Sequence, residues 1–195
     1  RKLYKLQISG KSMEIVEDIK PTELYSAIAI GPFDKAKRVL ERRGYRVVSL
    51  EENAQLRIQQ GKDAYISRNG NWVREGVIYV PGKGKFLTKI SPIMQNPGKA
   101  TNLHRNGKDF YLNKKQVEAS LEDSVELSVK EIPTNRFGED DITSFAFGES
   151  AKAYGDFLRE SGINSMPIYT TELQDQPFVS TLWFGCLGVR SELGG

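Results

Sequence analysis

The side chains with the most reactive chemistry are few and lie far apart in this sequence. It contains one cysteine, Cys186, and one histidine, His104. Nucleophilic catalysis by the thiolate would need that single imidazole as its base. A zinc site would need clustered His, Cys or carboxylate ligands, which the chain does not offer. We therefore expect neither a Cys–His catalytic pair nor a zinc site of the ordinary type.

Two short motifs could bind ions. The acids Glu139-Asp140-Asp141 could ligate calcium, but they lack the alternating spacing of an EF-hand loop. Acids at the start of a helix are better explained by the helix dipole. Gly82-Lys83-Gly84-Lys85 could surround a phosphate, but a P-loop has a longer glycine spacing that ends in Lys-Ser or Lys-Thr. A turn between strands is the better interpretation, and we expect no metal and no cofactor.

A group of polar residues lies in residues 91–109, a segment with Pro92, Pro97 and two glycines that predicts an irregular loop. The group consists of His104, Arg105, Lys108 and Asp109. Such a loop could serve an enzyme or a nucleic-acid-handling domain, which is the alternative function. Mixed charge in a loop is more often solvated surface.

The C-terminal segment joins an apolar anchor to small, chemically mixed residues. Phe178 to Phe184 is rich in apolar and aromatic side chains and contains Leu182-Trp183-Phe184. Aromatic residues in strands usually belong to the core, so we expect a core position for Trp183. The residues that follow are Gly185, Cys186, Leu187, Gly188, Val189, Arg190 and Ser191. An apolar segment followed by such chemically mixed residues indicates a site that recognises a ligand.

The Leu-Trp-Phe block followed by Gly, Arg, Ser and Leu resembles the C-terminal segment of the variable proteins of diversity-generating retroelements, in particular their archaeal branch. A looser similarity extends to residues 132–137, 154–158, 49–53 and 69–80. The resemblance implies a C-type lectin fold and a non-enzymatic protein that binds a ligand or another protein. It implies a hypervariable segment over about residues 178–195, with Gly185 to Ser191 as the ligand-binding residues.

The mutagenesis of that family acts on adenines in Asn-type codons that end in a pyrimidine. The codons that result can encode every residue from Cys186 to Ser191 but not Trp or Glu, so Trp183 should be invariant scaffold and Glu192 should lie outside the varied codons. Relatives carry a longer polar stretch before the closing Gly-Val-Arg, whereas Gly188 follows Leu187 directly here. We hypothesise that a variable loop after Leu187 is missing from this sequence.

Two other uses of the same fold are not supported by the sequence. Sugar-binding C-type lectins hold calcium with a Glu-Pro-Asn or Gln-Pro-Asp type of triplet, and formylglycine-generating enzymes need a pair of cysteines. The chain has no such triplet and only one cysteine. The resemblance therefore implies binding of a protein or another macromolecular surface, of unknown identity, and no enzymatic activity.

Composition sets the remaining expectations. With 195 residues and 38% hydrophobic residues, we expect one domain over residues 1–195 and a monomer. The net charge is only +3 with both signs interleaved, so we expect no nucleic-acid partner. No apolar run reaches the roughly 20 residues of a membrane span. The single cysteine favours a cytoplasmic location, and the start lacks Met and a signal-peptide core, which suggests a trimmed N-terminus.

The candidate residues must be positioned by the strands and helices of the fold. The order of the predicted strands and helices along the chain predicts an α+β fold with a mainly antiparallel sheet and flanking helices on one side. Alternation and turn signals predict strands at residues 2–9, 45–50, 64–66, 72–73, 76–80, 86–87, 163–170 and 178–184. An Asn69-Gly70 hairpin is part of that prediction. Helices are predicted after Pro32, Ser49, Asn113 and Asp140 and around 153–158, and residues 24–30 could be strand or helix.

Overall fold

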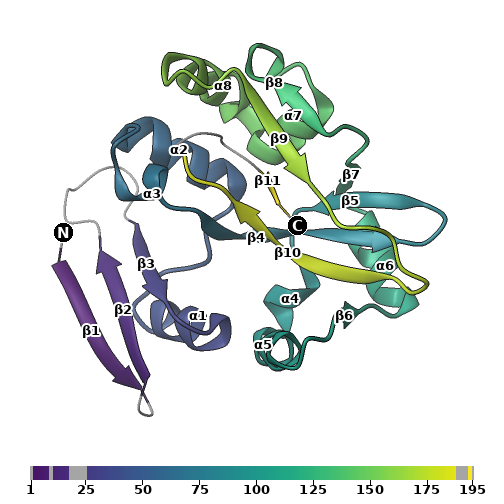
Figure 1. Cartoon of the computed structure of the whole chain (residues 1–195), viewed down its shortest axis with the longest axis horizontal. Helices are drawn as coiled ribbons and strands as arrows, with labels where there is room; N and C mark the ends of the chain where they lie inside the picture. The colour runs from purple at the N-terminus through teal and green to yellow at the C-terminus, as the bar shows by residue number, and fades with distance from the viewer. Residues whose placement is uncertain (1, 9–10, 18–25, 188–192, 195) are drawn as a thin grey trace. The chain divides into compact units, whose positions relative to one another are not determined.

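The structure, a computed structural model, describes all residues except 1, 9–10, 18–25, 188–192 and 195. The chain forms two compact units, one made of residues 1–47 and 96–108 and the other of residues 48–95 and 109–195 (Figure 1). The smaller unit is discontinuous in sequence. One domain over residues 1–195 stays a prediction.

The smaller unit consists of a three-stranded antiparallel sheet and two helices. Its elements are β1 (Lys2–Ile8), β2 (Lys11–Glu17), β3 (Ala27–Ile30), α1 (Phe33–Glu41) and α5 (Pro97–Arg105), with strand order β1-β2-β3. Helix α1 contacts both β3 and α5. Its apolar side packs Ala36, Val39 and Leu40 together with Ala29 of β3. The predicted strand at residues 2–9 and the helix after Pro32 are confirmed, and the described part of residues 24–30 contains a strand.

The larger unit contains the remaining elements. Its helices are α2 (Leu50–Gln60), α3 (Tyr65–Arg68), α4 (Pro92–Gln95), α6 (Lys114–Leu121), α7 (Asp141–Phe147) and α8 (Ala151–Glu160), with 3-10 turns η1 (Thr134–Arg136) and η2 (Gly148–Ser150). Its strands are β4 (Asn71–Val80), β5 (Gly84–Thr88), β6 (Phe110–Tyr111), β7 (Ser124–Glu126), β8 (Glu131–Pro133), β9 (Ser165–Tyr169), β10 (Phe178–Phe184) and β11 (Leu193–Gly194).

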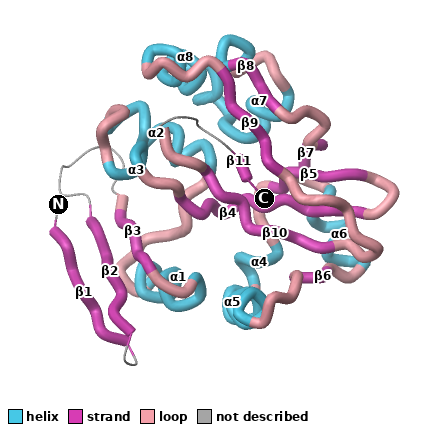
Figure 2. Tube along the Cα trace, in the orientation of Figure 1, coloured by secondary structure: helices cyan, strands magenta, loops and turns pink. Residues whose placement is uncertain are grey.

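These strands form one mainly antiparallel sheet. The order is β7-β5-β4-β10-β11-β9-β8, and β6 pairs with β10 beside this path (Figure 2). Only β11 and β9 pair in parallel among the described strands of this sheet. The sheet and its helices confirm the α+β prediction.

Helices lie against both faces of the sheet, so the prediction that they pack on one side is wrong. Residues 75–80 of β4 are all buried. Val77 and Tyr79 belong to the main core, whereas Ile78, which is equally buried, does not. Because successive side chains of a strand point to opposite faces, both faces must be covered. Helices α4 and α6 contact β4, as does α2.

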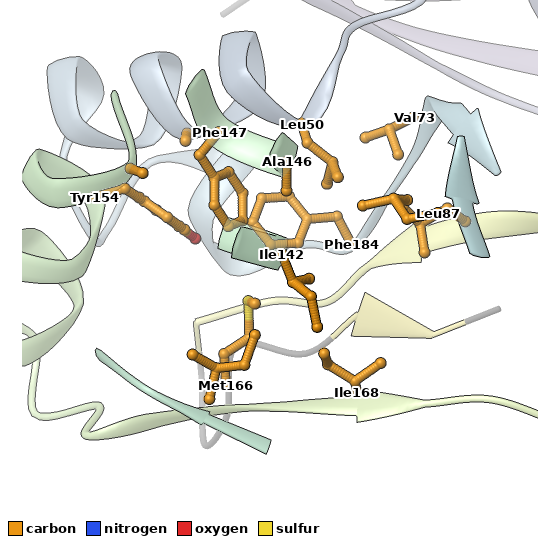
Figure 3. Close-up of a cluster of buried hydrophobic side chains, with 14 of the residues drawn as sticks. Leu50, Val73, Leu87, Ile142, Ala146, Phe147, Tyr154, Met166, Ile168 and Phe184 are labelled. Carbon is orange, nitrogen blue, oxygen red and sulfur yellow. The ribbon is translucent and has the colours of Figure 1, made fainter. Parts of the chain in front are cut away.

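The main core fills the space between the sheet and helices α2, α7 and α8. Phe147 of α7, Tyr154 of α8 and Phe184 of β10 bring their rings within 5.1 to 5.8 Å of one another, centroid to centroid (Figure 3). Met166 and Ile168 of β9 close the cluster below them. Aromatic pairs at this separation add to the free energy gained from burial.

Local capping signals in the sequence are confirmed. Ser49 and Glu52 form a reciprocal capping box at the start of α2, and Asn113 and Gln116 do the same at α6. The Asp140 carboxylate accepts hydrogen bonds from two backbone N–H groups at the start of α7. Short-range hydrogen bonds of this kind depend on few neighbours, which is why the sequence predicts them well.

Three local predictions are wrong. Residues 45–50 are not a strand, because the Ser49 capping box starts α2 at Leu50. Residues 91–108 are not an irregular loop but contain α4 and α5, the latter with Pro97 at its first turn. The Asn69-Gly70 hairpin is also absent: residues 65–68 are helical, and Asn69 is extended with a ψ of 142°.

Gly155 lies in α8 where a side chain has no room, which yields a first prediction. An added Cβ would lie 2.4 Å from the Thr134 carbonyl oxygen and 2.6 Å from the Phe137 Cβ. We expect Gly155→Ala to lower the free energy of unfolding by about 1–3 kcal/mol, as other overpacked cores do. Urea unfolding measures this.

Gly98 in α5 is the matched control, since it is also helical but an added Cβ would meet nothing within 4 Å. Gly98→Ala should raise stability by about 0.5–1 kcal/mol through its helix propensity. Equal effects of the two substitutions would contradict the packing of α8 on η1.

Candidate functional site

Strand β10 leads directly into the predicted ligand-binding residues, Gly185 to Ser191. Leu182 and Phe184 are buried in the main core, and the intervening Trp183 lies on the opposite face of the strand. The predicted core position of Trp183 is therefore wrong, because this side chain is only partly buried. Its ring lies edge-on to that of Trp72, at 4.8 Å between centroids, and 46% of Trp72 is exposed.

Gly70 explains how Trp183 is held. An added Cβ at residue 70 would lie 2.2 Å from the Trp183 ring, so the indole lies directly on this backbone. Glycine is thus needed here for close approach and not for a hairpin turn. The contact gives Trp183 a structural role, and its invariance stays a prediction. A glycine that permits a ring contact from a distant strand leaves no local signal in the sequence.

A buried arginine anchors the chain just after β10. Arg57 of α2 is fully buried, and its Nη2 donates a hydrogen bond to the Gly185 carbonyl at 2.7 Å. Its Nη1 donates to the Tyr154 hydroxyl at 3.0 Å, and its guanidinium lies 4.0 Å from the centre of the Phe184 ring. One side chain therefore links α2, α8 and the end of β10.

Sequence reasoning missed Arg57, although one signal was present. Leu50, Ala54 and Arg57 follow the 3.6-residue spacing of the buried face of α2. An arginine in an apolar stripe must find internal acceptors, which marks it as a candidate for a structural hydrogen-bond network.

A second anchor follows two residues later. The Leu187 N–H donates to the Ser67 carbonyl of α3 at 2.7 Å, and the Ser67 hydroxyl in turn donates to the Gly61 carbonyl at 2.8 Å. Ser67 is fully buried, and Leu187 packs against the main core. The backbone from Gly185 to Leu187 is consequently held by α2 on one side and α3 on the other.

The chain then returns to the same sheet. Trp183 and Phe184 of β10 pair with Gly194 and Leu193 of β11, which also pairs with β9. Residues 185–192 therefore connect two neighbouring antiparallel strands. Hydrogen bonds restrain the backbone at both ends of this connection.

The described members of the predicted ligand-binding set have different surroundings. Gly185 is buried, Cys186 is a half-buried free thiol, and Leu187 packs on the core. Gly188, Val189, Arg190 and Ser191 lie outside the described residues, as does the junction at which a missing loop was hypothesised. Ligand binding by these seven residues stays a prediction.

The other candidate residues are divided between the two units. His104, Arg105 and Lys108 belong to the smaller unit, whereas Asp109 belongs to the larger unit and accepts a hydrogen bond from Gln174. Glu139, Asp140 and Asp141 start α7, and the described residues include no group of three His, Cys, Asp or Glu side chains that could hold a metal. Residues 81–83 make the turn between β4 and β5.

Two further polar residues are buried, one on α2 and one on β4. Asn53, one helical turn before Arg57 on α2, is fully buried, and its amide has no hydrogen-bond partner among the described residues. Glu75 of β4 is 1% exposed and accepts a hydrogen bond from the Leu50 N–H at 3.0 Å. Burial raises the pKa of Glu75 from 4.5 to about 7, against the lowering effect of its backbone hydrogen bonds, Arg74 and Lys89.

Comparison with known proteins identifies the fold. No protein-family model and no curated protein matches the sequence. A solved structure described as the accommodation of massive sequence variation in Nanoarchaeota by the C-type lectin fold matches with a TM-score of 0.64 and 16% sequence identity. The match covers 85% of this chain and 88% of that one. The chain has a C-type lectin fold, as the resemblance implies.

No helix among the described residues is long and apolar enough to cross a membrane.

Removal of the buried guanidinium should loosen the anchored segment. Arg57→Met leaves the Gly185 carbonyl and the Tyr154 hydroxyl without this donor, and we expect a loss of about 2–4 kcal/mol in the free energy of unfolding. Amide hydrogen exchange of peptides that cover Phe184 to Leu187 should become faster. Arg159→Met, at an exposed arginine of α8, is the control and should change neither quantity. Unchanged exchange in Arg57→Met would contradict the anchoring role.

Glu75 should make stability depend on pH. Because its pKa is raised in the folded protein, the folded state binds a proton that the unfolded state releases between pH 4.5 and about 7. The free energy of unfolding should therefore fall by roughly 3 kcal/mol as the pH rises through this window. Glu75→Gln keeps an acceptor for the Leu50 N–H and should remove this dependence. If the free energy of unfolding changed with pH in the same way for the parent protein and Glu75→Gln from pH 4 to 8, the pH dependence would not come from Glu75.

Proposed function

We propose that this chain is the variable protein of a diversity-generating retroelement of archaeal type, a non-enzymatic binding protein that contacts its target through residues 185–191. The main support is the restraint on this segment: β10 and β11 pair on either side of it, and Arg57 and Ser67 bind its first backbone groups. The solved structure with the same fold is described as accommodating massive sequence variation.

The restraint matters because a varied surface must not unfold the protein that carries it. The anchoring bonds at Gly185 and Leu187 use backbone groups, which every residue type except proline supplies in full. A change of side chain therefore leaves these two hydrogen bonds intact. In this proposal the backbone groups of Gly185 and Leu187 also hold the segment in place, and Cys186 and Gly188 to Ser191 provide most of its variable contacts.

The chemistry near the segment suits a protein or another macromolecular surface. Trp72 is a large aromatic side chain, 46% exposed, beside Trp183 at the start of the connection. Partly exposed Trp and Arg are the residue types that contribute most energy at interfaces. Within the proposed contact set, residues 185–191, Arg190 is the arginine. The binding protein acts as a monomer.

The retroelement origin predicts a feature of the coding DNA. A nearby repeat should match the codons for Gly185 to Ser191 except at adenines, next to a reverse transcriptase gene. The codons for Trp183 and Glu192 should be identical in both copies. A locus without a repeat and without a reverse transcriptase would refute this origin but leave the binding role open.

The binding role itself can be tested with two matched display libraries. One library varies Cys186, Val189, Arg190 and Ser191; the other varies four exposed residues of α6 and its end, Lys114, Lys115, Glu118 and Glu122. With biotinylated ubiquitin as the target, we expect submicromolar binders from the first library only.

Binders from the first library should keep thermal midpoints within about 3 °C of the parent, because substitutions in a restrained surface segment cost little. Equal yields from the two libraries, or a general loss of folding in the first, would contradict the assignment of residues 185–191 as the contact surface.

A further inference from the structure

The two units of the chain carry opposite net charge, which the composition of the whole chain conceals. Residues 1–47 and 96–108 contain fourteen Lys and Arg against six Asp and Glu, a net charge of +8. The rest of the chain contains fourteen Lys and Arg against nineteen Asp and Glu, a net charge of −5. The balance of +3 is thus the sum of a strongly basic unit and an acidic one.

The basic charge is concentrated on two helices that pack against each other. Helices α1 and α5 are in contact, and the Asp34 N–H of α1 donates to the Thr101 hydroxyl of α5 at 3.2 Å. The exposed basic residues on these helices or in the few residues that follow each of them are Arg38, Arg42, Arg43, Arg46, Lys99, Arg105 and Lys108. We name these seven residues the basic surface.

Part of the basic surface is not paired with an acid among the described residues. Arg38, Arg42, Arg105 and Lys108 form no ion pair among the described residues. Glu41, an exposed acid of α1, is paired with Lys37. Uncompensated cations on adjacent helices create a positive potential that attracts polyanions.

We propose that the basic surface binds the phosphate backbone of nucleic acid, and that this surface is distinct from the target-binding segment at residues 185–191. Five of its seven members are arginines, whose planar guanidinium binds phosphate through two parallel hydrogen bonds. Such binding is independent of sequence, because phosphates carry no base identity.

An anionic membrane fits the basic surface less well. A helix that lies on a lipid surface inserts an apolar face. In α1 the apolar side chains Ala36, Val39 and Leu40 are packed inside the unit, and Ile30 is the large exposed hydrophobic residue that the structure describes in this unit. A protein partner also fits the basic surface less well, because protein interfaces usually have aromatic or aliphatic residues at their centre.

The test measures binding of the whole chain to a fluorescent, random-sequence DNA duplex at 50–300 mM NaCl. Contacts from Arg38, Arg42, Arg105 and Lys108 to four phosphates predict a slope of about −3.6 for log affinity against log salt. Arg38→Gln/Arg42→Gln should reduce the steepness by about 2 and weaken affinity at 50 mM NaCl roughly a hundredfold. Arg105→Gln/Lys108→Gln, on the other helix, should act in the same way.

The control removes two charges from the acidic unit. Arg136→Gln/Arg159→Gln changes two exposed arginines there and should leave duplex binding unchanged. Circular dichroism confirms that each variant is folded. Absence of duplex binding, affinity independent of salt, equal losses in the control, or stronger binding to phosphatidylserine vesicles than to the duplex would each overturn the proposal. Replacement of Val189, Arg190 and Ser191 by alanine should not alter duplex binding, which separates this proposal from the proposed function.

Discussion

The buried guanidinium of Arg57 is the interaction on which the C-terminal half of the larger unit depends. It joins α2 to the Tyr154 hydroxyl of α8 and to the Gly185 carbonyl at the end of β10, while its face lies on the Phe184 ring. A charged group can stay in an apolar interior only when hydrogen bonds replace its lost hydration. The hydrogen bond from Arg57 therefore restrains Gly185, and the connection to β11 starts from that restrained point.

In this chain the C-type lectin fold is stabilised by packing and strand pairing and not by a disulfide. The single cysteine, Cys186, excludes an intrachain bridge. Strand pairing of β10 with β4, β11 and β6, together with the Phe147, Tyr154 and Phe184 rings, supplies the rigidity instead. Leu187 is the last residue described as packing on this core, and the residues beyond it are the ones to which we assign most of the recognition.

The opposite net charges of the two units are the basis of the second interaction that we propose. A basic unit of net charge +8 attracts anionic partners, whereas an acidic unit of net charge −5 repels them at the same ionic strength. The expectation of no nucleic-acid partner depended on the average over the whole chain. The average conceals the difference between the units, because α5, residues 97–105, forms one unit with residues 1–47.

Short-range chemistry determined much of this protein from the sequence alone. The capping boxes at Ser49 and Asn113, the Asp140 cap and the alternation in β10 each involve groups a few residues apart, and the α+β class follows from them. Resemblance over residues 178–191 indicated the lectin fold. Only the tertiary structure decided that Gly70 receives the Trp183 ring, that Arg57 binds Gly185, and that two segments 48 residues apart in the chain form one basic unit. Those contacts join residues distant in sequence, so no local pattern encodes them, and their partners become known only when the chain is folded.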